Sequence, residues 1–295
     1  MKKEDIRSIF VIIFVVVLGI LLAIAGGDGG LMVFGNVSLF ALNIGIAFII
    51  QWLVFIPSYL KKTEKFYDLT GSVSYVTIII TTFLLSPTIS LRSGILMVMV
   101  LAWSLRLGIF LFRRVIKAGK DRRFDDIKQS PFNYLKAWTI QGLWVSFTIA
   151  AALAAMTSGL NPKFGVFGIL GIIVWIVGYS FEAIADFQKN KFRSDLANKG
   201  KFIHTGLWSL SRHPNYFGEI TIWIGVVLIA FPSLQGLQYI TLISPVFVAL
   251  LITKVSGVPK LEKYADEKWG GQEDYEKYKR ETPVLIPKLP LFKML

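Results

Sequence analysis

The sequence predicts an all-α polytopic membrane protein, a bundle of seven to eight transmembrane helices. Of its 295 residues, 54% are hydrophobic and only 17% are charged, and the mean hydropathy is +0.59. That composition is too apolar for an ordinary soluble domain. Eight apolar runs approach the roughly 20 residues that cross a bilayer. They fall near residues 9–25, 38–60, 72–90, 94–112, 137–157, 164–186, 216–232 and 237–254.

The basic residues predict the orientation of these spans. Of the 32 lysines and arginines, 29 lie in the N-terminal segment and in the segments after the second, fourth, sixth and eighth runs. The opposite loops hold Arg92 and Lys163 alone. Because basic loops stay on the cytoplasmic side, we expect both chain termini in the cytoplasm.

The first run has a second interpretation. Lys2 and Lys3 precede an apolar stretch that ends in the small-residue sequence Ala23-Ile-Ala25, as in a cleaved signal peptide. The stretch is long for a signal peptide, so we favour an uncleaved span, with seven spans as the alternative. No repeat or linker divides the chain, which predicts one domain over 1–295, made of N-terminal spans (1–60), core spans (61–254) and a cytoplasmic amphipathic cap (255–295).

Composition also excludes several function classes. The net charge of +13 does not indicate nucleic-acid binding, since the sequence offers no water-exposed domain with a basic face. Without cysteine there is no disulfide, thiolate metal site or cysteine nucleophile, and two histidines form no metal motif. We therefore expect no metal centre.

The most specific stretch is Gly206 to Glu219, which reads GLWSLSRHPNYFGE. Proline is favoured at the first position of a helix, so a helix should begin at Pro214. Arg212 and His213 then stand beside the free backbone N–H groups of its first turn, which predicts an anion site. A plain basic loop that follows the positive-inside rule is the blander interpretation. Asn215, Glu219 and Trp223 follow at four-residue intervals and share one face, while Gly218 and Gly225 mark another where a helix can approach closely.

Polar residues in or near the other spans are candidates for a structural or functional role, because placing a charged group in a bilayer is unfavourable in free energy. Arg106 lies near the middle of the fourth span, where it pairs with an acid or holds a ligand anion. Asp68 begins the third span, as a helix cap or as a desolvated acid that donates to a substrate carbonyl, with Tyr67 as a second donor. Gln51 is interpreted as an interhelical hydrogen bond.

Two acids lie at the cytoplasmic end of the sixth span. Glu182 and Asp186 stand one helical turn apart, and Arg193 follows. A solvated helix end explains them, or they line a polar pocket where a charged cofactor docks. The glycines between 165 and 171 are interpreted as helix packing, because no strand precedes them as a phosphate-binding loop requires.

Five motifs together resemble the steroid 5-alpha-reductase family, especially its bacterial membrane members, over roughly residues 60–290. They are the sequences YDLTG at 67–71, WSLRLG at 103–108, DRRF at 121–124, the long stretch at 206–219, and SGVPKLE at 256–262. The sequence motif Arg-His-Pro-x-Tyr also occurs in sterol reductases and isoprenylcysteine methyltransferases. The resemblance implies a membrane enzyme that uses NADPH to reduce a carbon–carbon double bond conjugated to a ketone.

The resemblance also implies roles for single residues. Asp186 and Arg193 correspond to an aspartate and a downstream arginine that contact the adenine and phosphate part of the cofactor. Asn215 corresponds to the residue at the nicotinamide end, and Glu219 supports it. Asp68 takes the place of the acid that holds the substrate ketone. The residues expected to bind the cofactor also include Glu182, Arg106, Arg212, His213 and Tyr216.

These inferences define the expected function. The enzyme reduces a 3-oxo-4-ene steroid or similar lipid enone in the bacterial inner membrane, as a monomer among lipids, with its cofactor site facing the cytoplasm. The alternative is a membrane methyltransferase of the isoprenylcysteine type that uses S-adenosylmethionine. A transporter would place facing polar groups at mid-membrane, whereas here they gather toward the cytoplasmic ends.

Overall fold

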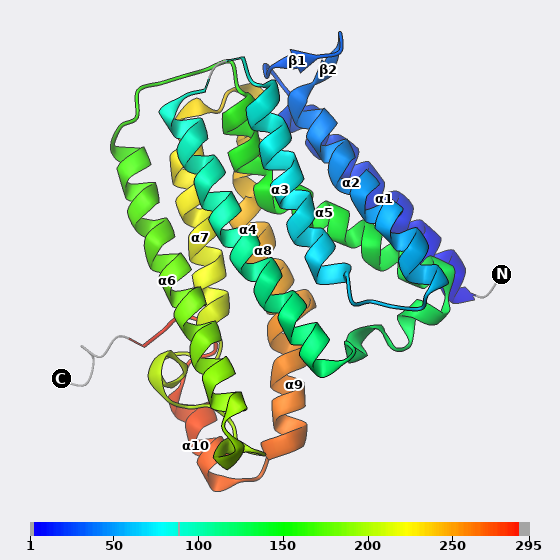
Figure 1. Cartoon of the computed structure of the whole chain (residues 1–295). Helices are drawn as coiled ribbons and strands as arrows, with labels where there is room; N and C mark the ends of the chain where they lie inside the picture. The colour runs from blue at the N-terminus through cyan, green and yellow to red at the C-terminus, as the bar shows by residue number, and fades with distance from the viewer. Residues whose placement is uncertain (1–2, 88, 289–295) are drawn as a thin grey trace. The chain divides into compact units, whose positions relative to one another are not determined.

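The computed structural model describes residues 3–87 and 89–288, and nearly all of the regular structure is helical (Figure 1). Its α-helices are α1 (Lys3–Gly26), α2 (Leu39–Leu60), α3 (Tyr67–Leu85), α4 (Leu91–Ala118), α5 (Pro131–Thr157), α6 (Val166–Ser194), α7 (Pro214–Ala230), α8 (Ser244–Leu250), α9 (Gly257–Trp269) and α10 (Glu273–Glu281). Strands β1 (Met32–Val33) and β2 (Val37–Ser38) form one short antiparallel pair. Short 3-10 turns lie in the loops, and a π-helical segment, Leu251–Val255, joins α8 to α9.

Eight helical segments within these described ranges are long and apolar enough to cross a membrane. Seven correspond to α1 through α7, and the eighth runs from Gly236 to Trp269 through α8 and α9. The chain is thus a multi-pass helical membrane protein, as the sequence predicts. The fifth helix begins earlier than the predicted residue 137, because Ser130 caps it by accepting a hydrogen bond from the N–H of Asn133, with Pro131 in the first turn.

The chain contacts divide into two compact units. The first unit comprises Met1–Gly168 and Ile229–Ser244, and the second comprises Ile169–Leu228 and Pro245–Leu295. The single-domain organisation stays a prediction.

Helix α5 is the most buried helix of the first unit. Its C-terminal half is a fully buried run that includes Ala150, Ala151, Ala152 and Ala154, and its N-terminal half buries Trp138 completely. Small residues let helix backbones approach closely. In a bilayer the hydrophobic effect does not drive helices together, so this close packing stabilises their association. Helices α1, α2 and α3 pack on α5, which makes it the centre of this unit.

Two buried amides connect α2 to α3. Asn43 Nδ2 donates to Thr82 Oγ1 at 3.0 Å, and Gln51 Nε2 donates to Ser74 Oγ at 2.9 Å. Both amide residues are fully buried. The prediction that Gln51 makes an interhelical hydrogen bond is therefore confirmed.

Helix α1 packs closely against its neighbours in the first unit. Its residues Gly19 and Gly26 lie against the rings of Phe48 and Phe40, where a Cβ would clash. Ser8 is fully buried and donates to Asn133 Oδ1 of α5 at 2.6 Å. Helix α1 is thus packed in the first unit as the first of the eight apolar segments, and its retention stays a prediction.

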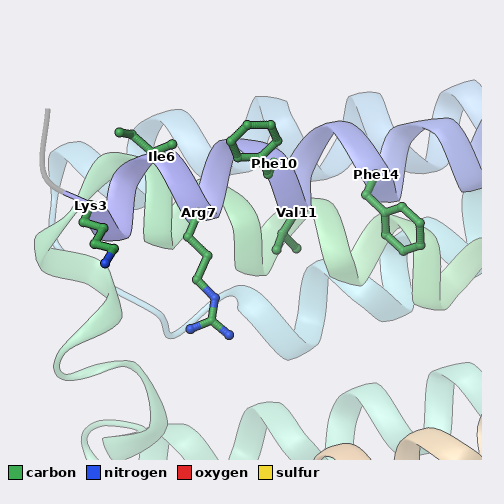
Figure 2. A pocket seen from close by; sticks show the side chains of 6 residues that line it. All are labelled: Lys3, Ile6, Arg7, Phe10, Val11 and Phe14. Atoms are coloured by element: carbon green, nitrogen blue, oxygen red, sulfur yellow. The ribbon is translucent and has the colours of Figure 1, made fainter.

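The outer side of α1 carries a hollow of about 480 Å³ (Figure 2). Every residue that lines it comes from α1, and the apolar side chains outnumber the two basic ones. Phe10 and Phe14 are well exposed there, as expected for a surface that contacts lipid. The lining residues are Lys3, Ile6, Arg7, Phe10, Val11 and Phe14.

Helices α6 and α7 approach each other through glycines. A Cβ added at Gly218 would lie 2.5 Å from the Glu182 nitrogen, and one added at Gly225 would lie 2.7 Å from the Gly171 carbonyl oxygen. The predicted close approach at Gly218 and Gly225 is thus confirmed. Gly171 belongs to the 165–171 glycine run, so its interpretation as helix packing also holds at this position.

A buried ion pair ties two loops of the first unit together. Glu64, only 3% exposed, accepts hydrogen bonds from Lys128 Nζ at 2.7 Å and from the backbone N–H of Asp121 at 2.9 Å. Burial opposes ionisation of this carboxyl, but these hydrogen bonds together outweigh it and lower its pKa. The loops 61–66 and 119–130 are therefore held by a carboxylate in its charged form.

This pair predicts acid sensitivity. A carboxylate with a lowered pKa contributes stability that is complete above its unfolded-state pKa of 4.5 and is lost as the pH falls through its folded-state value. We expect Glu64→Gln to lower the melting temperature at neutral pH and to flatten its decline over the acidic range that begins near pH 4.5 and extends below it. Thermal unfolding in detergent across that range measures this, and an unchanged decline in the variant would contradict it.

The C-terminal segment differs from the expected single amphipathic helix. It forms two helices, α9 and α10, because Gly270 and Gly271 interrupt it and Gly271 adopts a positive φ of 82°. Tyr275 of α10 is buried and donates to Asp266 of α9 at 2.9 Å. The residues after 288 lie outside the described structure.

Candidate functional site

The start of α7 has the predicted form, with one difference. The helix begins at Pro214, as expected. However, Glu262 of α9 occupies the neighbourhood of the predicted anion site: its carboxylate pairs with Arg212 Nη1 at 2.5 Å and lies 2.8 Å from His213 Nε2. A carboxylate of the chain itself therefore neutralises part of the positive charge at this helix start.

His213 is enclosed on several sides. It is 5% exposed and its ring stacks on Tyr216, with centroids 5.5 Å apart and planes inclined by 13°. Gly257 lets α9 approach that tyrosine, since a Cβ there would lie 2.9 Å from the ring. Burial lowers the pKa of His213 below 6.5, and Glu262 only partly opposes this. At neutral pH the imidazole is therefore uncharged.

Asp186 and Asn215 meet, although they are far apart in the sequence. Asn215 Nδ2 donates to Asp186 Oδ1 at 3.3 Å. Asp186 is 6% exposed and Glu182, one turn earlier, is 2% exposed. Burial on this scale excludes the solvated helix end as an explanation for the two acids. Glu219 is half-buried on the α7 face that it shares with Asn215.

A pocket of about 120 Å³ opens in the second unit. Its walls come from the end of α6, the 201–213 loop, α9 and α10, and they combine basic and aromatic side chains. The basic residues are Lys189, Arg193, Lys201 and Arg212, and the remaining lining residues are Phe192, Phe202, Ile203, Trp208, His213, Leu261, Glu262, Tyr264, Ala265, Trp269, Tyr275 and Tyr278.

The aromatic part of the pocket centres on Phe202. Its ring lies 5.9 Å from Trp269, 5.3 Å from Tyr275 and 5.4 Å from Tyr278. The Tyr278 hydroxyl donates to the carbonyl of Trp208 at 2.7 Å, which fixes α10 against the 201–213 loop. Lys189 Nζ lies 4.2 Å from the Trp208 ring centroid. Four basic groups beside rigid aromatic faces suit a ligand that has both phosphates and a planar base.

The remaining candidate residues belong to the first unit. Asp68 is not a helix cap: its carboxylate lies 3.4 Å from Arg114 Nη2 and 3.5 Å from Arg123 Nη2. Tyr67 donates to the Ala137 carbonyl at 3.0 Å, and its ring lies 4.7 Å from Phe124. The motifs at 67–71 and 121–124 are thus neighbours in space. Arg106 is half-buried in α4.

Sequence reasoning missed several residues of this pocket. Glu262 ends the motif at 256–262, but its contact with His213 depends on how α9 folds back. Lys189 and Lys201 were counted only as basic loop residues. Phe202 carried no signal, and Trp269, Tyr275 and Tyr278 were predicted only as parts of the amphipathic cap at 255–295.

The fold and this pocket define a class: a polytopic helical membrane protein with a pocket of basic and aromatic side chains in its second unit. Residues 54–282 match a family model described as "Protein of unknown function (DUF1295)", and the chain belongs to that family. The match includes all five motifs quoted above and every candidate site residue.

Three curated proteins are similar to parts of the chain. A probable 7-dehydrocholesterol reductase of Acanthamoeba polyphaga mimivirus is 30% identical over 33% of this chain and 25% of its own length. The Delta(14)-sterol reductase of Methylotuvimicrobium alcaliphilum is 28% identical over 56% of this chain and 40% of its own. The probable O-methyltransferase ustE of Ustilaginoidea virens is 30% identical over 35% and 42%. The chain thus spans less than half the length of each relative, and no solved structure matches it.

Proposed function

We propose that the protein is a membrane reductase that uses NADPH to reduce a carbon–carbon double bond of a lipid. The observation that carries this proposal is the pocket of the second unit, where four basic side chains adjoin a rigid aromatic cluster. The two sterol reductases among the relatives agree with it. We further propose that the substrate is an enone, a 3-oxo-4-ene steroid or similar lipid, as in the steroid 5-alpha-reductase family.

The basic and aromatic pocket residues and the other candidate residues have proposed tasks in cofactor binding. Arg193, Lys189 and Lys201 bind the phosphates of the adenosine half, and the rings around Phe202 pack against its base. Asp186 orients Asn215 toward the nicotinamide end, since the two side chains already share a hydrogen bond. Glu219 supports Asn215 from the same helix face. Glu182, Arg212, His213 and Tyr216 complete the proposed site, and Arg106 of the first unit is proposed to bind a cofactor phosphate.

The reduction adds a hydride to the β-carbon of the enone and a proton to its α-carbon. NADPH, when bound, supplies the hydride. Asp68 and Tyr67 are proposed to polarise the ketone and so stabilise the negative charge that develops on its oxygen. Both side chains have protein partners, so a ketone would replace the contact with Arg114, Arg123 or the Ala137 carbonyl. The proton that is added to the α-carbon comes from solvent.

The methyltransferase among the relatives supports a second candidate, transfer of a methyl group from S-adenosylmethionine. Charge favours the reductase. S-adenosylmethionine has a net positive charge from its sulfonium, ammonium and carboxylate groups, whereas the pocket presents four basic residues and a single acid, Glu262. NADPH, with its three phosphate groups, is the better electrostatic complement.

Ligand binding to the purified protein separates the two candidates. A ligand at one hundred times its dissociation constant stabilises a protein by about 2.7 kcal/mol. We expect NADPH to raise the melting temperature in detergent, NADH to raise it less, and S-adenosylmethionine to leave it unchanged. A rise with S-adenosylmethionine alone would replace the proposal by methyl transfer.

Arg193 is expected to contribute directly to NADPH affinity. Its guanidinium lines the pocket, and a charge-assisted hydrogen bond to a phosphate contributes about 1.5–3 kcal/mol. Arg193→Ala should therefore raise the dissociation constant of NADPH by about tenfold or more. Isothermal titration measures this, with Arg280→Ala as the control, because Arg280 is an exposed residue of α10 that does not line the pocket. Equal affinity in Arg193→Ala and the wild type would remove Arg193 from the site.

A further inference from the structure

The chain after α10 returns to the Arg-His-Pro motif. The backbone N–H of Arg212 donates to the Pro283 carbonyl at 2.9 Å, and the N–H of Lys288 donates to the Leu210 carbonyl at 2.9 Å. We call residues 283–288 the C-terminal strap. It runs alongside residues 210–212, so the last described residues of the chain border the pocket loop.

Ser211 joins the strap to His213 through one hydroxyl group. This fully buried side chain donates to the Leu285 carbonyl at 2.8 Å and accepts from the backbone N–H of His213 at 3.1 Å. Two successive N–H groups before α7 are thus satisfied, one by the strap directly and one through Ser211. The side chains of those same two residues contact Glu262.

Hydrophobic burial explains the position of the strap only in part. Ile286 is 71% exposed and Val284 is 37% exposed, while Leu285 is half-buried. The segment is also held by the two backbone hydrogen bonds to Arg212 and Leu210 and by the Ser211 hydroxyl. Pro283 and Pro287 restrict its backbone, which reduces the entropy lost when it becomes ordered.

We propose that Ser211 and the C-terminal strap act as a positioning device for the pocket, holding Arg212 and His213 in the geometry that binds the cofactor. Ser211 is thereby a positioning residue that touches no ligand itself. This inference rests on the proposed function for its effect on NADPH, but the effect on His213 can be tested without any ligand.

The ligand-free test uses the titration of His213. The charged groups that face this imidazole are Glu262 of α9, Lys189 of α6 and its neighbour Arg212. Because burial keeps its pKa below 6.5, loosening the loop should admit water and raise that pKa toward 6.5. The chain has two histidines, so isotope-labelled histidine NMR gives two signals, with the exposed His204 as an internal reference.

We expect Ser211→Ala to raise the pKa of His213, and Ser209→Ala to leave it unchanged. Ser209 is the matched control, since its hydroxyl bonds locally to the Gly206 carbonyl at 2.7 Å. A chain that stops after Thr282 should behave like Ser211→Ala, whereas one that stops after Lys288 keeps every described contact of the strap. If His213 titrates alike in Ser211→Ala and the wild type, the strap is not a positioning device.

A measurement of NADPH affinity then tests whether the strap matters for the proposed function. In Ser211→Ala, we expect the dissociation constant of NADPH to rise about tenfold, since a buried hydrogen-bonded pair is disrupted. A changed His213 titration with unchanged NADPH affinity would overturn the cofactor part of the inference alone. If the wild type binds no NADPH at all, the proposed function fails, while the titration result still decides the role of the strap.

Discussion

Replacing Gly218 by leucine should unfold or severely destabilise the second unit. A Cβ at this position would lie 2.5 Å from the Glu182 nitrogen and 2.6 Å from the Gly178 carbonyl oxygen, both of which are backbone atoms of α6. A backbone cannot move aside as a flexible side chain can, so α6 and α7 would have to separate. Overpacking costs about 1–3 kcal/mol where side chains adapt, and we expect at least the upper end of that range here.

Thermal unfolding in detergent, followed by tryptophan fluorescence, measures this effect. The matched control is Gly45→Ala, because Gly45 is also a helical glycine but has nothing within 4 Å of an added Cβ. Alanine favours the helix by about 1 kcal/mol over glycine, so the control should be neutral or slightly stabilised. A Gly218→Leu protein as stable as the wild type would mean that α6 and α7 do not pack through this glycine.

Much of the fold follows from the sequence, because a bilayer restricts the choices. A span must be helical and about 20 residues long, so apolar runs locate all eight segments. Helix ends were less accurate. The third apolar run begins near residue 72, because Asp68 and Thr70 are polar. Helix α3 nevertheless includes both residues and begins at Tyr67. Helix formation depends on backbone hydrogen bonds, which hydropathy does not measure.

The site was less predictable than the fold. Spacing along one helix placed Asn215 and Glu219 on one face, and the hydrogen bond from Asn215 to Asp186 agrees with the polar pocket expected at this end of α6. Nothing in the local pattern showed that Glu262 would meet His213, or that residues 283–288 would bond to residues 210–212. Such contacts depend on turns that lie far from residues 210–213 in the sequence. The hydrophobic periodicity of a helix gives no information about them.

Replacing Asp68 by asparagine should lower the turnover of the proposed reaction about 100-fold, with little change in NADPH affinity. A donor that stabilises charge at the reacting oxygen acts mainly in the transition state, and losing one costs about 100- to 1,000-fold in turnover. Asparagine keeps the shape of the side chain, but its amide N–H is a weaker hydrogen-bond donor than a carboxylic acid and does not transfer a proton. Initial rates with NADPH and a 3-oxo-4-ene steroid give the turnover, and titration without the steroid gives the cofactor affinity.

The control for Asp68 is its neighbour in the same charge network. Asp121 also pairs with Arg123, through its own carboxylate, and its removal disturbs that arginine without touching Asp68. If Asp68 polarises the ketone, Asp121→Asn should keep most of the turnover that Asp68→Asn loses. Equal losses in both variants would instead mean that the two acids act by holding Arg123 over the Phe124 ring, and Asp68 would leave the mechanism as a catalytic group.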